Sequence, residues 1–222
     1  MTLSNKIEFR HSSTDTYKIV AFHLMTNEVK VLSFGDNVWR NFQCLPVVPT
    51  YRSPRFYKHV GIKHGVYVCG TLNWLAIQNK FQNDYQIDWK LITIGQFMII
   101  SLDLSTETYR QLMAPQGFDI VPCVQPSLAV LMDSLCFYHD LHGTGFIIWQ
   151  MKKFGVEESW TPFLRISFHS LSLVPNHCRL RLFPVCLSEN GDTLILAWGK
   201  SKQTILYNLR DNIIRLKCSF GL

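Results

Sequence analysis

Cys136, His139 and His142 are the residues whose types and spacing most resemble a metal site. They form the pattern Cys-x-x-His-x-x-His where a strand-like run gives way to a loop. Thiolates and imidazoles are the usual ligands of zinc, but a structural zinc site takes four of them. The sequence offers no fourth ligand beside these three, so we favour ordinary strand-end residues and predict neither a metal nor another cofactor.

Two further groups have the residue types of a catalytic site without its arrangement. Glu157 and Glu158 are adjacent in a charged turn, where their side chains diverge, whereas acid–base catalysis needs groups that converge in a desolvated site. Asp140 and His142 accompany dispersed serines, but no Gly-x-Ser-x-Gly elbow marks a nucleophile. We therefore predict no catalytic residues and no enzyme. A propeller hydrolase remains an alternative that would require convergent carboxylates.

A basic and aromatic segment at 51–64 is the best candidate for binding. The strongest candidates in this segment are Arg52, Arg55, Phe56, Tyr57 and Lys58. Trp89, in a second polar insert, is a further candidate. Cations between aromatic rings can hold phosphates and stack on bases. The plainer interpretation is a solvated loop whose rings pack against a neighbouring sheet.

Composition excludes several classes of protein. Hydrophobic residues make up 47% of the 222 residues and charged residues 17%, the balance of a globular chain rather than a disordered one. No apolar run approaches the roughly 18–20 residues of a membrane helix. The start, MTLSNKIEFRHSS, lacks the apolar region of a secretory signal. We therefore expect a soluble protein of the cytoplasm, the nucleus or both.

Cysteine usage and charge agree with that expectation. The seven cysteines are odd in number and contain no Cys-x-x-Cys pair, which indicates free thiols in a reducing compartment. The net charge of +6 lies mostly in the first part, because residues 1–100 hold eleven Lys and Arg against six Asp and Glu. This basic bias is modest, and it indicates a binding surface only if the charges cluster on one face.

The elements that must position these residues are β-strands. Short runs with alternating apolar residues are separated by turn residues, and helical periodicity is missing. Four loose units share an apolar arm, a polar turn and a return arm, at 29–39, 99–109, 147–160 and 205–214. Tighter hairpins are predicted between them at 65–77, 128–138 and 187–198. The tryptophans predicted to be packing residues are Trp39, Trp74, Trp149, Trp160 and Trp198.

Alternating tight and loose hairpins favour an all-β, degenerate β-propeller, because consecutive four-stranded blades would produce that order. A β-sandwich is the alternative, since spacing alone cannot distinguish the two. The least regular pieces are 45–64, which contains three prolines, and the polar stretch 78–94. Both are predicted to be loops.

Eight segments, in order, resemble the F-box-associated domain of plant F-box proteins, including the F-box/kelch-like group. IEFRHSSTDTYKIV at 7–20 is similar to the family's opening segment with its Tyr-Lys-Val-Val. EVKVLSFGDNVWRNF at 28–42, GVYVCGTLNWLA at 65–76 and MIISLDLSTETYRQLMAP at 98–115 resemble the units that follow. LAVLMDSLCFY, IIWQMKKFGVEESWTPFLRI, LSENGDTLIL and LYNLRDNIIRLK complete the series. Leu102 stands where the family has Phe.

The resemblance implies a kelch-like propeller domain over 1–222 that recruits substrate proteins to an SCF-type ubiquitin ligase. It implies no chemistry in this chain. We expect no F-box before Ile7, a propeller that is incomplete at its N-terminal end, and contact with the Skp-type adaptor and cullin only through an F-box. If the 51–64 segment binds, an acidic or phosphorylated protein surface fits the family better than nucleic acid. A phospholigand or nucleic-acid binding module is the alternative function, and no membrane partner is expected.

Overall fold

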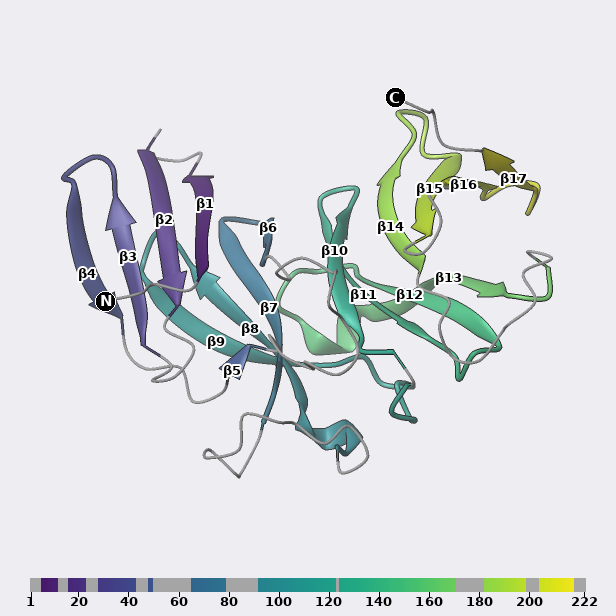
Figure 1. Cartoon of the computed structure of the whole chain (residues 1–222), viewed down its shortest axis with the longest axis horizontal. Helices are drawn as coiled ribbons and strands as arrows, with labels where there is room; N and C mark the ends of the chain where they lie inside the picture. Colours follow the sequence, from purple (N-terminus) through teal and green to yellow (C-terminus); the bar gives the residue numbers. More distant parts are fainter. Residues whose placement is uncertain are drawn as a thin grey trace. The chain divides into compact units, whose positions relative to one another are not determined.

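The computed structural model describes residues 5–11, 16–22, 28–42, 48–49, 65–78, 92–122, 124–170, 182–198 and 204–217. Within these ranges the chain forms four antiparallel sheets and two short 3-10 helices, η2 (Ile94–Gln96) and η3 (Glu157–Ser159) (Figure 1). None of the helices described is long and apolar enough to cross a membrane. The chain divides into two compact units, Met1–Ala114 and Pro115–Leu222, each with two sheets.

The first unit contains the first and second sheets. The first sheet is a meander of β1 (Asn5–His11), β2 (Thr16–Phe22), β3 (Val29–Ser33) and β4 (Val38–Phe42). The second sheet contains β5 (Val48–Pro49), β6 (Val66–Val68), β7 (Thr71–Ile77), β8 (Phe97–Asp103) and β9 (Thr108–Met113). Both β5 and β6 pair with β7, so together they form one interrupted edge strand.

The second unit contains the third and fourth sheets. The third sheet joins β10 (Ser127–Leu131), β11 (Ser134–Asp140), β12 (Gly145–Met151) and β13 (Trp160–Ser167) in sequence order. The fourth joins β14 (Leu182–Leu187), β15 (Thr193–Trp198), β16 (Thr204–Asn208) and β17 (Ile214–Lys217) in the same way. A bulge at Ile148/Trp149 interrupts the β12–β13 register, and another lies in β14 between Pro184 and Cys186.

Each unit has an apolar core made by one face of both of its sheets. In the first unit, Val20 and Val31 of the first sheet pack with Leu72, Trp74 and Ile100 of the second. In the second unit the shared core holds, among others, Cys136, Ile148, Phe168, Leu196 and Ile205. Burying alternate residues of paired strands against a neighbouring sheet is the main favourable term in such folds.

The predicted hairpins coincide with the observed ones. The four loose units are the third and fourth strands of the four sheets, and the three tight hairpins are β6–β7, β10–β11 and β14–β15. Four meandering sheets are the pattern of propeller blades and not of the alternative, a β-sandwich. Two strands were missed in sequence. One is β1, which completes a four-stranded first sheet, and the other is β5, which falls inside the predicted 45–64 loop.

Candidate functional site

The six predicted binding residues, Arg52, Arg55, Phe56, Tyr57, Lys58 and Trp89, lie outside the described residues. The two ends of the segment that carries the first five are described. Pro49 pairs with Ala76 and Val66 pairs with Asn73. Residues 50–64 therefore leave and rejoin the edge of the same strand, β7, on either side of the Trp74–Leu75 step.

Gly65, where this segment rejoins the sheet, is fixed by the indole of Trp74. A Cβ on Gly65 would lie 2.4 Å from Nε1 of Trp74, far inside the contact distance of two heavy atoms. Trp74 itself is buried, as predicted for a packing residue. Any larger residue at position 65 would displace either the core or the end of the segment.

The insert that carries Trp89 is closed at its base by two glutamines. The backbone N–H of Gln78 donates to the carbonyl of Gln96 at 2.7 Å. The Gln96 amide Nε2 donates to the Gln78 carbonyl at 2.9 Å. Because Gln78 directly follows β7, both predicted binding segments are attached to one strand. All seven residues of β7 are buried, and a rigid strand is a suitable support for contact loops.

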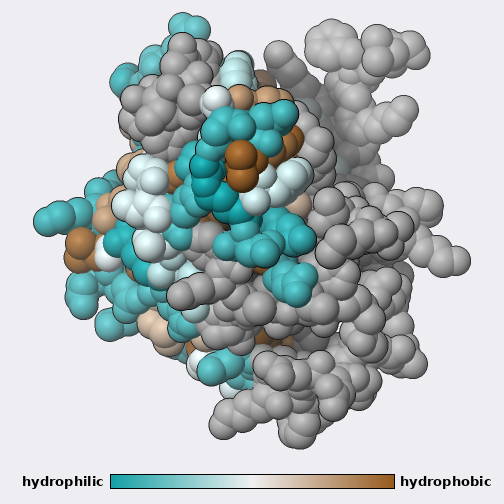
Figure 2. All heavy atoms as spheres, turned by 90° about the vertical axis from the view of Figure 1, so that its left-hand side faces the viewer, coloured by the Kyte–Doolittle hydropathy of each residue, from teal (hydrophilic) through white to brown (hydrophobic). Residues whose placement is uncertain are grey.

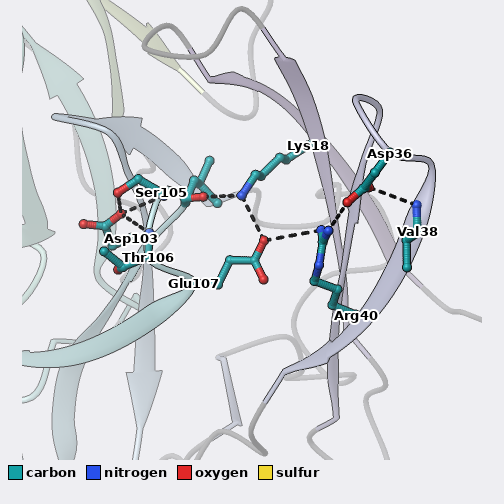
Figure 3. Close-up of polar contacts among 9 residues, drawn as sticks. Lys18, Asp36, Val38, Arg40, Asp103, Ser105, Thr106 and Glu107 are labelled. Carbon is teal, nitrogen blue, oxygen red and sulfur yellow. Dashed lines mark hydrogen bonds and ion pairs between the residues drawn. The ribbon is translucent and has the colours of Figure 1, made fainter.

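Sequence reasoning missed a polar network that joins the first and second sheets (Figure 3). Lys18 Nζ on β2 donates to the Leu104 carbonyl at 2.5 Å and to Glu107 Oε1 at 2.9 Å, both in the β8–β9 turn. Arg40 Nη1 on β4 lies 3.9 Å from the same Glu107 oxygen, and Arg40 also pairs with Asp36. One carboxylate thus forms ion pairs with residues from two strands of the neighbouring sheet.

Two of the segments that resemble the family, 7–20 and 98–115, contain the residues at the centre of this network. Lys18 is the lysine of Tyr-Lys-Ile-Val, a charged residue within an apolar strand, and it is only 9% exposed. Such a buried charge needs a partner. Glu107 belongs to the segment at 98–115, and nothing in the spacing of the two motifs indicates that they meet.

Of the five tryptophans predicted to be packing residues, one is exposed. Trp74 and Trp160 are buried and Trp149 and Trp198 are partly buried, but Trp39 on β4 is 42% exposed. Nearby, Tyr17 and Phe34 stack edge to face with their ring centroids 6.4 Å apart, and both are about half exposed. Figure 2 shows the side of the molecule to which β4 belongs, where apolar atoms lie among polar ones.

The residues with metal-like spacing do not converge. Cys136 packs in the core shared with the fourth sheet, and burial raises the pKa of its thiol to about 12. His139, three residues further along β11, lies on the other face of the strand beside Phe118, with ring centroids 4.8 Å apart. His142 is exposed in the following turn. Among the described residues no group of His, Cys, Asp and Glu is arranged to hold a metal.

His139 is instead part of a buried aromatic cluster with Phe118 and Phe137, on the face of β11 opposite Cys136. Its Nδ1 lies 2.9 Å from the Asp140 carbonyl, so this nitrogen carries the proton, and Trp149 Nε1 donates to Nε2 at 3.4 Å. Burial lowers the pKa of His139, with Asp140 opposing that shift. Asp140 is occupied in accepting the backbone N–H groups of Val124 and Gly143 at 3.0 Å. These residues act as scaffold.

Comparison with known proteins now decides the family. The model of the F-box-associated β-propeller domain matches residues 4–218. The chain belongs to that family. The resemblance and the all-β propeller fold predicted from the sequence are confirmed, and the domain is of the kind that mediates interactions in F-box proteins.

An F-box/kelch-repeat protein of Arabidopsis thaliana is 28% identical over 164 residues, which cover 69% of this chain. The chain spans 37% of that relative's length. Among solved structures, TolB of Acinetobacter baumannii shares 13% identity at a TM-score of 0.41, over 95% of this chain and 42% of that one. The Cps50 (Swd1) β-propeller domain of Myceliophteria thermophila shares 11% at 0.46, over 91% and 57%.

Proposed function

We propose that this F-box-associated domain binds a substrate protein and presents it to an SCF-type ubiquitin ligase, without performing chemistry itself. The Skp-type adaptor and the cullin would be reached through an F-box, which is a module separate from the F-box-associated domain. Ubiquitin transfer would take place on other subunits, in the cytoplasm, the nucleus or both.

The observation that carries this proposal is the family match over residues 4–218, together with an F-box/kelch-repeat relative. The described part of the chain adds a physical argument. The family fold is a β scaffold. Two polar segments, 50–64 and 79–91, are both attached to one buried strand of it, β7. Segments of this kind on a rigid support are where proteins place recognition residues.

The charge of the 50–64 segment points to an acidic partner. It holds four Lys and Arg and no Asp or Glu. Arginine pairs with carboxylates and phosphates through two parallel hydrogen bonds, which favours an acidic or phosphorylated peptide. We propose Arg52, Arg55, Phe56, Tyr57 and Lys58 as contact residues, with Trp89 as a neighbouring apolar contact.

Co-purification tests the proposal. The full chain, with and without an F-box fused at its N-terminus, is expressed with proximity labelling, and captured proteins are compared. We expect one set of substrates with both forms, adaptor and cullin only with the fusion, and faster turnover of the substrates only with the fusion. The same substrates without altered turnover would contradict the ligase role.

The Arg55→Glu variant tests the contact surface. Its matched control is Arg210→Glu, the same substitution at an exposed arginine of the other unit. We expect Arg55→Glu to lose substrate and Arg210→Glu to retain it. Nuclease treatment separates the alternative function: a nucleic-acid binder would lose its captured proteins after that treatment, and its binding would fall steeply with salt.

A further inference from the structure

In three of the four sheets the third and fourth strands are joined by a six-residue turn, counted from Ser33, Asp103 or Asn208, and at its fifth position two of the turns carry asparagine and one carries glutamate. The fifth residue is left-handed in each: Asn37 at φ 54°, Glu107 at φ 55° and Asn212 at φ 55°. Asparagine is several-fold enriched in this conformation, whereas a residue such as glutamate adopts it at a cost. Glu107 is therefore unfavourable for its own turn.

The contacts of Glu107 explain why the turn carries it. Its side chain, 23% exposed, accepts from Lys18, whose side chain is 11% exposed, at 2.9 Å, and faces Arg40 at 3.9 Å. Both basic residues belong to the first sheet, and Glu107 belongs to the second. Residues that hold a strained backbone conformation do so where the surroundings fix them, and such positions concentrate at switching elements.

We propose that Glu107, held by Lys18 and Arg40, is a catch that fixes the first sheet on the second and whose release lets the first sheet open by itself. Opening would uncover the face of β2 and β3 that carries Val20, Val29 and Val31. Partial opening of one packed unit before global unfolding is a general property of folded chains. Here its equilibrium depends on ion pairs that salt weakens.

The catch and a purely local turn role predict opposite results for Glu107→Asn. If Glu107 only fills the turn, asparagine matches Asn37 and Asn212 and protects the region. If Glu107 is the catch, asparagine satisfies the backbone but removes the carboxylate that Lys18 and Arg40 share, and the first sheet opens more often. The sign of the effect therefore decides between them, independently of whether the proposed ligase function is correct.

Hydrogen exchange of the full chain, followed by mass spectrometry, shows whether Glu107→Asn makes the first sheet exchange faster or slower. For Glu107→Asn we expect the amides of β2 and β3 to exchange at least tenfold faster, with β15 and β16 unchanged. The matched control is Arg210→Gln, which removes the Arg210–Asp192 pair within the fourth sheet, and it should leave β2 and β3 unchanged. Equal or slower exchange of β2 and β3 in Glu107→Asn would overturn the proposal.

The wild-type chain provides a second test that needs no variant to fold. Raising the salt from roughly 0.05 M to about 1 M shortens the Debye length severalfold, and the partly exposed Glu107–Arg40 pair should weaken. We expect the exchange of β2 and β3 to accelerate relative to that of β15 and β16. Exchange of β2 and β3 that does not change with salt would overturn the proposal, as would equal or slower exchange in Glu107→Asn.

Discussion

The β8–β9 turn of the first unit and the β16–β17 turn of the second begin in the same way. Asp103 Oδ1 accepts the backbone N–H groups of the residues two and three positions later, at 2.7 and 3.2 Å. Asn208 Oδ1 does the same at 2.8 and 3.0 Å. Both turns then place their fifth residue in the left-handed region. The backbone of the repeat is thus set by a local side-chain cap.

The two turns diverge in what the fifth side chain reaches. Glu107 crosses to Lys18 of the neighbouring sheet, whereas Asn212 stays local and accepts from the Tyr207 hydroxyl at 2.8 Å. The ion pair next to the second turn, Arg210–Asp192, also lies within one sheet. One turn backbone can therefore carry either a local contact or an inter-sheet contact, according to what its fifth side chain reaches.

The largest expected effect tests what the two units share. Ile100 and Ile205 are fully buried, one in each core. Replacing either with alanine should cost about 3 kcal/mol of unfolding free energy, because the lost transfer energy is increased by the cavity that remains. Urea unfolding with hydrogen exchange by unit checks this. A strongly unequal pair of losses would show that one unit does not depend on its apolar core as the other does.

Gly117 gives the next largest effect and belongs to the second unit alone. It has φ +92°, and a Cβ there would lie 2.9 Å from Cη2 of Trp149. Gly117→Ala should therefore cost about 2–3 kcal/mol, from strain and from displacement of the indole. Gly191→Ala is the matched control, because Gly191 has φ +72° with nothing near its Cβ, and it should cost about 1 kcal/mol. Equal losses in urea unfolding would remove the Trp149 contact from the account.

Removing one charged residue from each ion pair compares the inter-sheet pair of the first unit with the pair inside the fourth sheet. Lys18→Met leaves Glu107 partly buried with Arg40 as its remaining cation, and should cost about 1–2 kcal/mol. Arg210→Gln removes a pair whose arginine is 74% exposed, and should cost no more than about 0.5 kcal/mol. The midpoints of urea unfolding measure both. A loss for Arg210→Gln as large as that for Lys18→Met would mean that the inter-sheet position of the first pair has no special weight.

Much of the fold was predictable because it depends on local signals. Alternation of apolar residues and turn chemistry located the β8–β9 and β16–β17 hairpins, and the order of motifs indicated the family. β1 was missed because only two apolar residues, Ile7 and Phe9, carry its alternation, and so short a run is a weak strand signal. β5 was missed because two residues ending in Pro49 carry almost no strand signal, and only their pairing with Ile77 and Ala76 reveals them.

The site was less predictable for a physical reason. The residues of the 51–64 segment could be chosen by type, and their attachment to β7 follows from long-range pairing that spacing does not encode. The same applies to Lys18 and Glu107, which are 89 residues apart in sequence. A buried lysine indicates that a partner exists but not which carboxylate provides it. Trp39 was wrongly predicted to be a packing residue, since a strand pattern does not show which face stays open.

The smallest expected effect concerns His139, a buried neutral ring in the third sheet of the second unit. His139 accepts from Trp149 while its other nitrogen faces the Asp140 carbonyl, so the added proton of the imidazolium form would displace the Trp149 donor. Burial lowers the pKa of His139. The unfolded chain therefore binds a proton at a pH where the folded chain does not, and stability is lost as the pH falls from about 6.5 toward the folded pKa.

His139→Gln separates this titration from the rest of the chain, because glutamine can accept from Trp149 and donate to the carbonyl without ionising. Urea unfolding at pH 7.5 and 5.5 should show a smaller loss of stability for His139→Gln than for the wild-type chain. His142→Gln, at the exposed histidine of the next turn, should retain the wild-type loss. If both variants lose the same amount of stability, the acid sensitivity of the second unit does not come from His139, and the neutral ring has no special weight in that unit.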